Sequence, residues 1–275
     1  MRWRIDLAYD GTNFAGWAAQ PGLRTVQGEL ETWLPRVLRS PDPIPVTVAG
    51  RTDAGVHATG QVAHFDLAGD DTTGADGVAE VATRRLRRVL ADDIVIAAVT
   101  ESPAGFDARF SALWRRYSYR VWDEEACPDP RQRGYTAATR GTLDLDTLNA
   151  AAGELIGLRD FAPFCKPREG ATTIRTLLDA HAERLADGTV DITVRADAFC
   201  HSMVRSLVGA LVAVATGQRD ATWLDRVAAH PVRHNEVLVM PAKGLTLVEV
   251  AYPEPDQLAE RAQAARSVRF LPEES

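Results

Sequence analysis

Residues Ala49–Gly60, AGRTDAGVHATG, hold an Arg-Thr-Asp triplet between glycines. The stretch PVTVAG running into them and the stretch GQVAHFDL running out both have strand composition, so Asp53 lies in a loop joining two strands at a sheet edge or cleft. Gly50 and Gly55 permit backbone conformations closed to other residues and leave room for a bulky ligand. An aspartate between glycines is most often a turn residue; the alternative is a functional carboxylate. His57 is either a hydrogen-bonded structural residue or a base.

The rest of the chain alternates between strand and helix patterns. Period-two alternation predicts strands at 2–9, 93–102, 113–122, 174–185, 189–196 and 244–252. Helical stripes predict helices at 25–40, 77–90, 145–156, 198–216 and 254–267, the first kinked or split by its proline at position 35. This order lacks a regular parallel strand-helix-strand rhythm and favours an α+β architecture with a mixed or antiparallel sheet. The aperiodic stretch 102–112 is the expected junction between two halves.

The composition is that of an ordinary globular protein. With 275 residues, 45% of them hydrophobic, the chain can form one large domain or two smaller ones. No apolar run approaches the length of a signal peptide or a membrane span, so we expect a cytoplasmic protein. Cys127, Cys165 and Cys200 are far apart and lack metal-ligand spacing, which disfavours a disulfide framework and a zinc site. We expect them to pack as small apolar side chains.

The net charge of −7 argues against a nucleic-acid partner, but the kind of basic residue argues for one. Of the 31 basic residues all except Lys166 and Lys243 are arginine, the side chain best suited to phosphate contacts, although a coding bias would give the same count. The clusters at 83–88, 114–120 and 131–133 could form basic strips on an acidic body. Net charge therefore does not decide the partner.

Residues 197–217, DAFCHSMVRSLVGALVAVATG, are apolar nearly all round and predict a buried helix with Arg205 in its middle. A buried guanidinium keeps its charge and needs an anionic partner. From the residues alone a structural ion pair is favoured; the alternative is that Arg205 reaches a carboxylate of the Asp53 loop. No second carboxylate, Ser-His pair or metal-ligand cluster accompanies Asp53, and the chain has no phosphate-loop or dinucleotide fingerprint. We therefore expect no metal and no nucleotide cofactor.

Several blocks of the chain together resemble the tRNA pseudouridine synthase A family. They are YDGTNFAGWAAQP, RTVQGELE, GRTDAGVHATGQVAHF, FDARFSALWRRYSYRV, DFAPFCK, FCHSMVRSLVGAL and PAKGLTLVEVAYP, in the family's order and covering Tyr9 to Pro253. One departure is Ala18, where the family usually has glutamine. The resemblance implies the pseudouridine synthase fold: two similar α/β halves, residues 1–105 and 106–275, with a mixed, largely antiparallel sheet flanked by helices and a catalytic cleft between them.

The resemblance also implies roles for individual residues. Asp53 is the catalytic aspartate, Tyr117 stacks on the target uracil, and Arg205 is the basic partner of Asp53. Leu245 closes the pocket, and Arg51 helps to hold the nucleotide out of the stack. These roles fit the physical chemistry, because a nearby positive charge keeps a carboxylate ionised and a tyrosine offers a planar face to a flipped base.

The implied activity is isomerisation of uridine to pseudouridine on the 3′ side of the anticodon stem-loop of tRNA. No external group enters the product, so no cofactor is implied. The family is also implied to act as a homodimer whose two subunits form the RNA-binding cleft. No membrane is expected as a partner. Two alternatives stay open. One is a catalytically inactive RNA-binding module of the same fold, against which the intact Asp53, Tyr117 and Arg205 speak; the other is a nucleoside hydrolase that releases free uracil.

Overall fold

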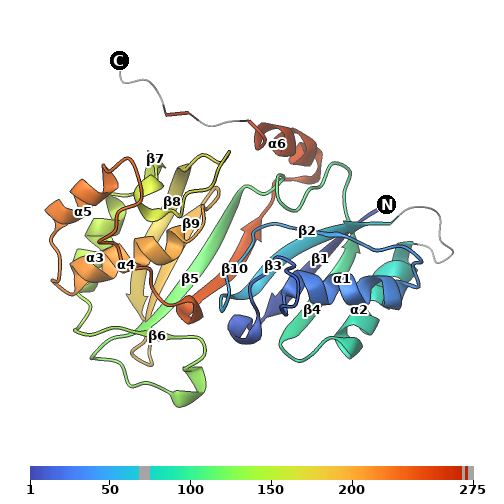
Figure 1. Cartoon of the computed structure of the whole chain (residues 1–275), viewed down its shortest axis with the longest axis horizontal. Coiled ribbons are helices and arrows are strands. Elements are labelled where there is room, and N and C mark those ends of the chain that lie inside the picture. The colour runs from blue at the N-terminus through green and yellow to red at the C-terminus, as the bar shows by residue number, and fades with distance from the viewer. Residues whose placement is uncertain (68–74, 268–269, 272–275) are drawn as a thin grey trace. The chain divides into compact units, whose positions relative to one another are not determined.

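The computed structural model describes residues 1–67, 75–267 and 270–271. It divides into two compact units: the first holds Met1–Leu113 and Leu247–Ser267, and the second holds Trp114–Thr246. Each unit contains strands of a sheet with helices packed on them (Figure 1). The predicted α+β class is confirmed.

In the first unit the strand order is β4 (Ile94–Glu101), β1 (Arg2–Tyr9), β3 (His57–Asp66) and β10 (Leu245–Ala251), which belongs to this unit from Leu247 on, with the short β2 (Val46–Val48) also paired to β3. The pairs of β1 with β3, β1 with β4 and β2 with β3 are antiparallel. Strand β1 alternates between half-buried and buried side chains as its sequence predicts. Helices α1 (Val26–Leu38) and α2 (Ala75–Val89) pack against each other, and α2 covers β4 (Figure 1).

Helix α1 shows how a local sequence sets its own ends. The hydroxyl of Thr25 accepts a hydrogen bond from the N–H of Gly28 at 3.2 Å, which satisfies one of the free amides of the first turn. At the other end Arg39 adopts the left-handed conformation, with φ 57°. Of the two expected effects of Pro35, a split of this helix was wrong, because α1 runs without a break from Val26 to Leu38, and a kink stays a prediction.

In the second unit the strand order is β5 (Trp114–Trp122), β9 (Val190–Ala196), β8 (Ile174–Arg184) and β7 (Gly157–Asp160), with antiparallel neighbours. The short β6 (Ala137–Ala138) pairs parallel to β5, so the sheet is mixed but largely antiparallel. Helix α3 (Leu145–Gly153) packs on β8, and α4 (Met203–Ala215) contacts both α3 and α5 (Ala221–Ala228) (Figure 1). A last helix, α6 (Leu258–Ala264), belongs to the first unit.

Helix α4 begins later than the sequence predicts. Its first residue is Met203 rather than a residue near Ala198, and Ser202 before it has a φ of 65°, which a helix cannot contain. Residues 198–202 therefore form a loop. The apolar residues of that loop continue the helical pattern in the sequence, which is why periodicity alone places the start of the helix too early.

Cys165 and Cys200 form a disulfide with a Cα–Cα distance of 5.8 Å, so the expectation of three unpaired cysteines was wrong. Cys127 is free and exposed rather than packed. The two bonded residues are 35 positions apart, and their segments also meet where the N–H of Lys166 donates to the carbonyl oxygen of His201 at 2.9 Å. The spacing of two cysteines along the chain does not predict that their segments lie side by side in the fold.

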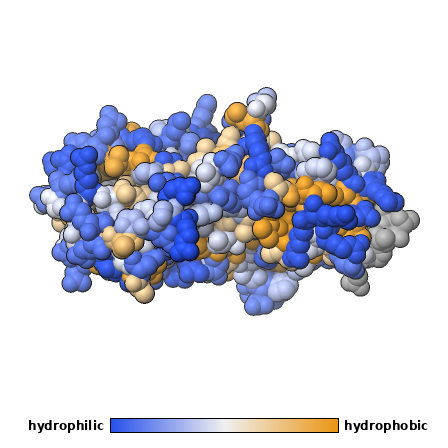
Figure 2. Space-filling model, turned by 90° about the horizontal axis from the view of Figure 1, so that it is seen from below, coloured by the Kyte–Doolittle hydropathy of each residue, from blue (hydrophilic) through white to orange (hydrophobic). Residues whose placement is uncertain are grey.

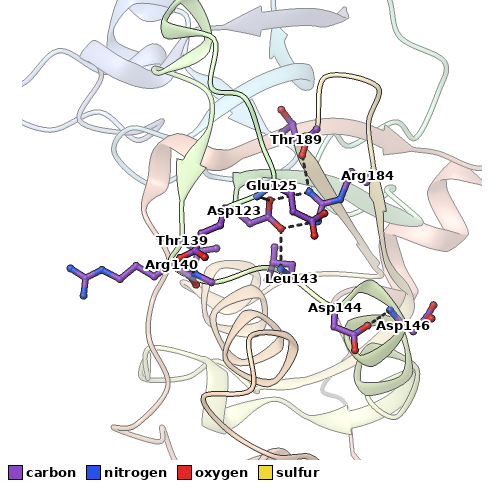
Figure 3. A network of polar contacts seen from close by, with 12 residues as sticks. Asp123, Glu125, Thr139, Arg140, Leu143, Asp144, Asp146, Arg184 and Thr189 are labelled. Carbon is purple, nitrogen blue, oxygen red and sulfur yellow. Dashed lines mark hydrogen bonds and ion pairs between the residues drawn. The ribbon is translucent and has the colours of Figure 1, made fainter.

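An ion pair between the buried Asp123 and Arg184 joins the chain after β5 to the end of β8 (Figure 3). Asp123 accepts hydrogen bonds from Arg184 at 2.9 and 2.7 Å and from the N–H of Leu143 at 2.9 Å. Burial alone would raise the pKa of Asp123, but the hydrogen bonds and the charge of Arg184 outweigh it and hold that pKa below its ordinary value. The ionised Asp123 thus fastens the end of β8 to the chain that follows β5.

Hydrophilic side chains cover most of the face seen in Figure 2, with apolar areas between them. Some of the large apolar side chains of the described residues are well exposed, among them Val95, Val232 and Leu238. No helix in the described part of the chain is long and apolar enough to span a bilayer.

Candidate active site

The loop with Asp53 joins β2 to β3. Three buried polar side chains, two outside the loop and one within it, form hydrogen bonds that hold its position. The Tyr9 hydroxyl lies 2.8 Å from Oγ1 of Thr52, and Nε2 of Gln61 donates to the Tyr9 hydroxyl at 3.1 Å and to the Gly50 carbonyl oxygen at 2.8 Å. Burial raises the pKa of Tyr9 to about 12 although its two hydrogen bonds oppose the shift, so Tyr9 stays a neutral phenol. Because it accepts from Gln61, its own proton is available to Thr52.

The segment after β1 lies directly against the same loop. The N–H of Trp17 donates to the carbonyl oxygen of Thr52 at 3.0 Å, and the N–H of Gly55 donates to the carbonyl oxygen of Phe14 at 3.3 Å. A Cβ at Gly11 would overlap the carbonyl oxygen of Val56, so only glycine permits this approach. Gly55 has a φ of 76°, which confirms that the loop needs glycine there.

His57 has the contacts of a structural residue. It is 2% exposed, its Nδ1 accepts a hydrogen bond from the N–H of Gly11 at 3.0 Å, and Oδ1 of Asp10 lies 3.1 Å from the same nitrogen. These contacts tie the start of β3 to the short 3₁₀ turn η1 (Gly11–Asn13). They favour the structural interpretation of His57 over that of a base.

The two site residues of the loop differ in exposure: Asp53 is half-buried and Arg51 is exposed. A hydrogen bond from the N–H of Val56 to the carbonyl oxygen of Asp53, at 3.2 Å, closes the turn. This main-chain hydrogen bond shapes the turn that presents Asp53, and the choice between a functional carboxylate and a turn cap stays a prediction.

Tyr117 lies on β5 in the second unit and is 7% exposed. The ring of Phe199 meets it edge to face, with centroids 5.0 Å apart and planes at 87°. The loop that carries Phe199 is anchored just before it, because Nη1 of Arg115 donates to the carbonyl oxygen of Asp197 at 2.9 Å. The Asp197 side chain accepts from the N–H of Thr176 at 3.1 Å and from its neighbour Ala198 at 2.6 Å, which fixes the turn after β9.

Arg205 is half-buried on α4, and its Nε donates to the carbonyl oxygen of Met240 at 2.6 Å. Nearby, the hydroxyl of Tyr119 donates to the carbonyl oxygen of Pro241 at 2.9 Å. Burial raises the pKa of Tyr119, and the positive charge of Arg205 lowers it in part. Leu245, 6% exposed, starts β10 a few residues later. Tyr119 and Arg205 thus both contact the chain that leads to Leu245, and Tyr117 lies two residues before Tyr119 on β5.

The structure places Arg51 and Asp53 in the first unit and Tyr117, Arg205 and Leu245 in the second. The pairing of Asp53 with Arg205 stays a prediction. No role is predicted from the sequence for Tyr9, Gln61, Tyr119 or Phe199, although all four lie within the blocks that resemble the family. The sequence signal that could have found Tyr9 and Tyr119 was their position on the inward face of a predicted strand. No sequence signal indicated the contacts of Gln61 and Phe199.

The predicted arginine cluster at 83–88 lies on α2. Nη1 of Arg85 donates to the carbonyl oxygen of Val37 at 2.7 Å, and Arg87 donates to the carbonyl oxygens of Ile96 and Ala97, the first at 2.6 Å. Arg84, by contrast, is exposed in an ion pair with Glu80, and Arg88 is also exposed. Arg85 and Arg87 therefore hold α2 to its neighbours within the first unit.

Comparisons with known proteins agree over nearly the whole chain. A family model described as tRNA pseudouridine synthase matches residues 151–253. The tRNA pseudouridine synthase A of Cutibacterium acnes is 66% identical over 270 residues, covering 98% of this chain and 95% of that protein. The proteins of the same name from Frankia casuarinae and Streptomyces avermitilis are 53% and 51% identical, each covering 99% of this chain and, respectively, 97% and 95% of their own lengths.

Among solved structures, one titled "Crystal structure of the archaeal box H/ACA sRNP Nop10-Cbf5 complex" matches with a TM-score of 0.36 and 12% identity over 94% of this chain and 54% of that one, a likeness too low to carry an argument. The identities to the bacterial relatives are decisive by themselves. The mixed sheet with its flanking helices is accordingly the pseudouridine synthase fold. The chain belongs to the tRNA pseudouridine synthase A family, isomerases that convert uridine to pseudouridine in tRNA.

Proposed function

We propose that this chain converts uridine to pseudouridine in tRNA, at uridines on the 3′ side of the anticodon stem-loop, with Asp53 as the catalytic residue. The observation that carries the proposal is the 66% identity over nearly the full chain, together with the supported loop that presents Asp53. An inactive RNA-binding module is not favoured, because Asp53, Tyr117 and Arg205 are all present.

The reaction breaks the bond between ribose C1′ and uracil N1, turns the base, and joins C1′ to C5. The C5 proton leaves and N1 takes up a proton, so atoms and charge balance without a further reactant. Asp53 can act by attack at C1′, by attack at C6, or by removal of a ribose proton, and each route needs its carboxylate ionised. As its proposed partner, the Arg205 guanidinium would favour that ionised form.

Tyr117 is proposed to stack on the target uracil. Its ring is already fixed from one side by the edge of Phe199, which lowers the cost of ordering it when the base arrives. Its hydroxyl is also a candidate base for the C5 proton. Leu245 would close the pocket with an apolar side chain, and the exposed Arg51 would help to hold the nucleotide out of the stack.

The remaining proposals concern RNA recognition, the oligomeric state, the location in the cell and the roles of the two halves. Recognition of several neighbouring uridines suits contacts to RNA shape and phosphates more than contacts to base edges. Of the α2 arginines, the exposed Arg84 and Arg88 are the candidates for phosphates. We further propose a homodimer that forms the RNA-binding cleft, in the cytoplasm. The division of labour between an N-terminal half with the Asp53 loop and a C-terminal half with Tyr117, Arg205 and Leu245 is part of the same proposal.

Product analysis tests the proposed reaction. A tRNA transcript is incubated with the protein, the fragment that contains the anticodon stem-loop is cut out with a nuclease, and its nucleosides are separated by chromatography. Pseudouridine in place of uridine at the anticodon stem-loop is expected. Free uracil would indicate the hydrolase instead, and unchanged uridine in a transcript that still binds would indicate the inactive module. A wild-type protein giving either of these results contradicts the proposed function.

A further inference from the structure

The segment Leu238–Leu245 leads from the chain after α5 to the start of β10 and contacts two side chains of the second unit, Arg205 and Tyr119. We call it the 238–245 segment. It contains the carbonyl that holds Arg205 and ends at Leu245, so it meets two residues of the proposed pocket. The inference drawn from it rests on the proposed function.

At its start the segment lies directly on α4 at Gly209. A Cβ at Gly209 would overlap the carbonyl oxygen of Leu238 and come within 3.0 Å of its carbonyl carbon. Any side chain there must push the main chain of the segment away from the helix, because a backbone carbonyl cannot rotate aside as a long side chain can. Gly209 is one turn from Arg205 on the same helix, so the two positions face the same segment.

At Met240 the segment is bonded to Arg205 from both sides. The Arg205 Nε donates to the carbonyl oxygen of Met240 at 2.6 Å, and the N–H of Met240 donates to the carbonyl oxygen of Arg205 at 3.1 Å. Because a guanidinium is planar and rigid, a fixed Nε–H direction also fixes the direction of its two terminal nitrogens. The position of Met240 therefore constrains where the charged end of Arg205 points.

At its far end the segment is seated on Tyr119. The Tyr119 hydroxyl donates to the carbonyl oxygen of Pro241 at 2.9 Å, and a Cβ at Gly244 would lie 2.6 Å from Cζ of the same ring. This close contact sets the position of Leu245, the next residue. Arg205 and Leu245 are thus placed by one continuous piece of main chain.

We propose that Gly209 is a positioning residue for pseudouridine formation: it lets the 238–245 segment lie against α4, and the segment in turn aims the Arg205 guanidinium and places Leu245. The substrate class is that of the proposed function, a uridine in folded RNA. Gly209 touches no reacting atom, and its effect passes through the 238–245 segment to Arg205 and Leu245.

The test compares Gly209→Ala with Gly153→Ala, since both replace a helical glycine and a Cβ at Gly153 meets nothing within 4 Å. Single-turnover and steady-state kinetics are measured on tRNA transcript at a temperature where circular dichroism shows both variants folded. We expect kcat of Gly209→Ala to fall by about tenfold to a hundredfold, as small misplacements of a catalytic group do. KM should stay within about twofold, because RNA contacts elsewhere are unchanged. Gly153→Ala should match the wild type.

Coupling to Arg205 separates positioning from a general loss of stability. In an Arg205→Lys background the planar group is gone, so adding Gly209→Ala should change kcat by less than about threefold. Equal effects of Gly209→Ala in both backgrounds would overturn the proposal, as would wild-type kcat in the single variant.

If Gly209→Ala does not fold, Tyr119→Phe tests the proposal in its place. This change removes the hydrogen bond that holds the other end of the segment and should lower kcat about threefold to tenfold. An unchanged kcat contradicts the proposal. Absence of pseudouridine from the wild type would instead refute the proposed function.

Discussion

The hydroxyl of Tyr9 lies 2.8 Å from Oγ1 of Thr52, the residue immediately before Asp53. Tyr9 ends strand β1, which lies between β4 and β3, and the same hydroxyl accepts from Gln61 on β3. The loop of the proposed catalytic aspartate is therefore held by the buried interior of its own unit and not by its surface. Such support keeps a functional loop in one geometry before substrate binds.

Replacing Tyr9 with Phe removes this hydroxyl while keeping the ring. Thr52 and Gln61 then lose a buried partner, so we expect the free energy of unfolding to fall by about 1 to 2 kcal/mol. We also expect turnover to fall by about tenfold because the Asp53 loop loosens. Tyr252→Phe is the matched control, since it removes a hydrogen bond to the carbonyl oxygen of Ala108 in the same unit. Equal turnover in the two variants would show that the loop does not depend on Tyr9.

The buried pair of Asp123 and Arg184 predicts acid sensitivity. Because the pKa of Asp123 is lowered in the folded state, its contribution is fully present above the ordinary carboxyl pKa of about 4 and is lost as the pH falls through the lowered value. Asp123→Asn should cost roughly 2 to 3 kcal/mol at neutral pH, the low end for a broken buried pair, since Arg184 keeps 24% of its side chain exposed.

Urea unfolding of the wild type and Asp123→Asn between pH 3 and 7 measures both effects, with Asp129→Asn as a control at an exposed pair. The difference in unfolding free energy between wild type and Asp123→Asn should shrink as the pH falls below about 4. A difference that is constant over this range would mean that Asp123 does not titrate as the structure requires.

The α2 arginines should divide into two classes. Arg87→Ala leaves main-chain carbonyls of β4 without their donor and should destabilise the protein by roughly 1 to 3 kcal/mol. The double change Arg84→Gln and Arg88→Gln should leave stability nearly unchanged. If these two side chains meet phosphates, it lowers the slope of log binding constant against log salt by about 1 to 2. Binding titrations at several salt concentrations check this, and an unchanged slope would place the phosphate contacts elsewhere.

The disulfide predicts a simple count of thiols. Alkylation of the unfolded protein in the absence of reductant should label Cys127 alone, because Cys165 and Cys200 are bonded to each other. After reduction all three cysteines should react, which mass spectrometry detects. Labelling of three thiols before any reduction would show that the bond is not formed in the isolated protein.

The parts of this molecule that the sequence predicts are those that depend on near neighbours. Alternating side chains on β1 and β5 are enough to place Tyr9, Tyr117 and Tyr119 on buried faces. What joins residues far apart in the chain was missed: Tyr9 and Thr52 are separated by 43 positions, and Cys165 and Cys200 by 35. The predicted start of α4 was wrong for a local reason. Ser202 takes a left-handed conformation, which its residue type does not predict.

The site itself was predicted through family resemblance more than through physical chemistry. On the residues alone Asp53 could be a turn residue and Arg205 a structural one. The main-chain closure of the Asp53 turn and the bond from Arg205 to Met240 are tertiary contacts that no single-sequence pattern contains. The first shapes the turn that carries Asp53, and the second holds the Arg205 guanidinium by its Nε.

The most direct test of the central claim is tritium release from tRNA transcript labelled at uracil C5, with the wild type beside Asp53→Asn and with Asp42→Asn, at an exposed surface position, as the control. The account predicts release by the wild type and by Asp42→Asn, and none by Asp53→Asn even though that variant folds and binds the transcript. Release by Asp53→Asn at the wild-type rate would contradict it.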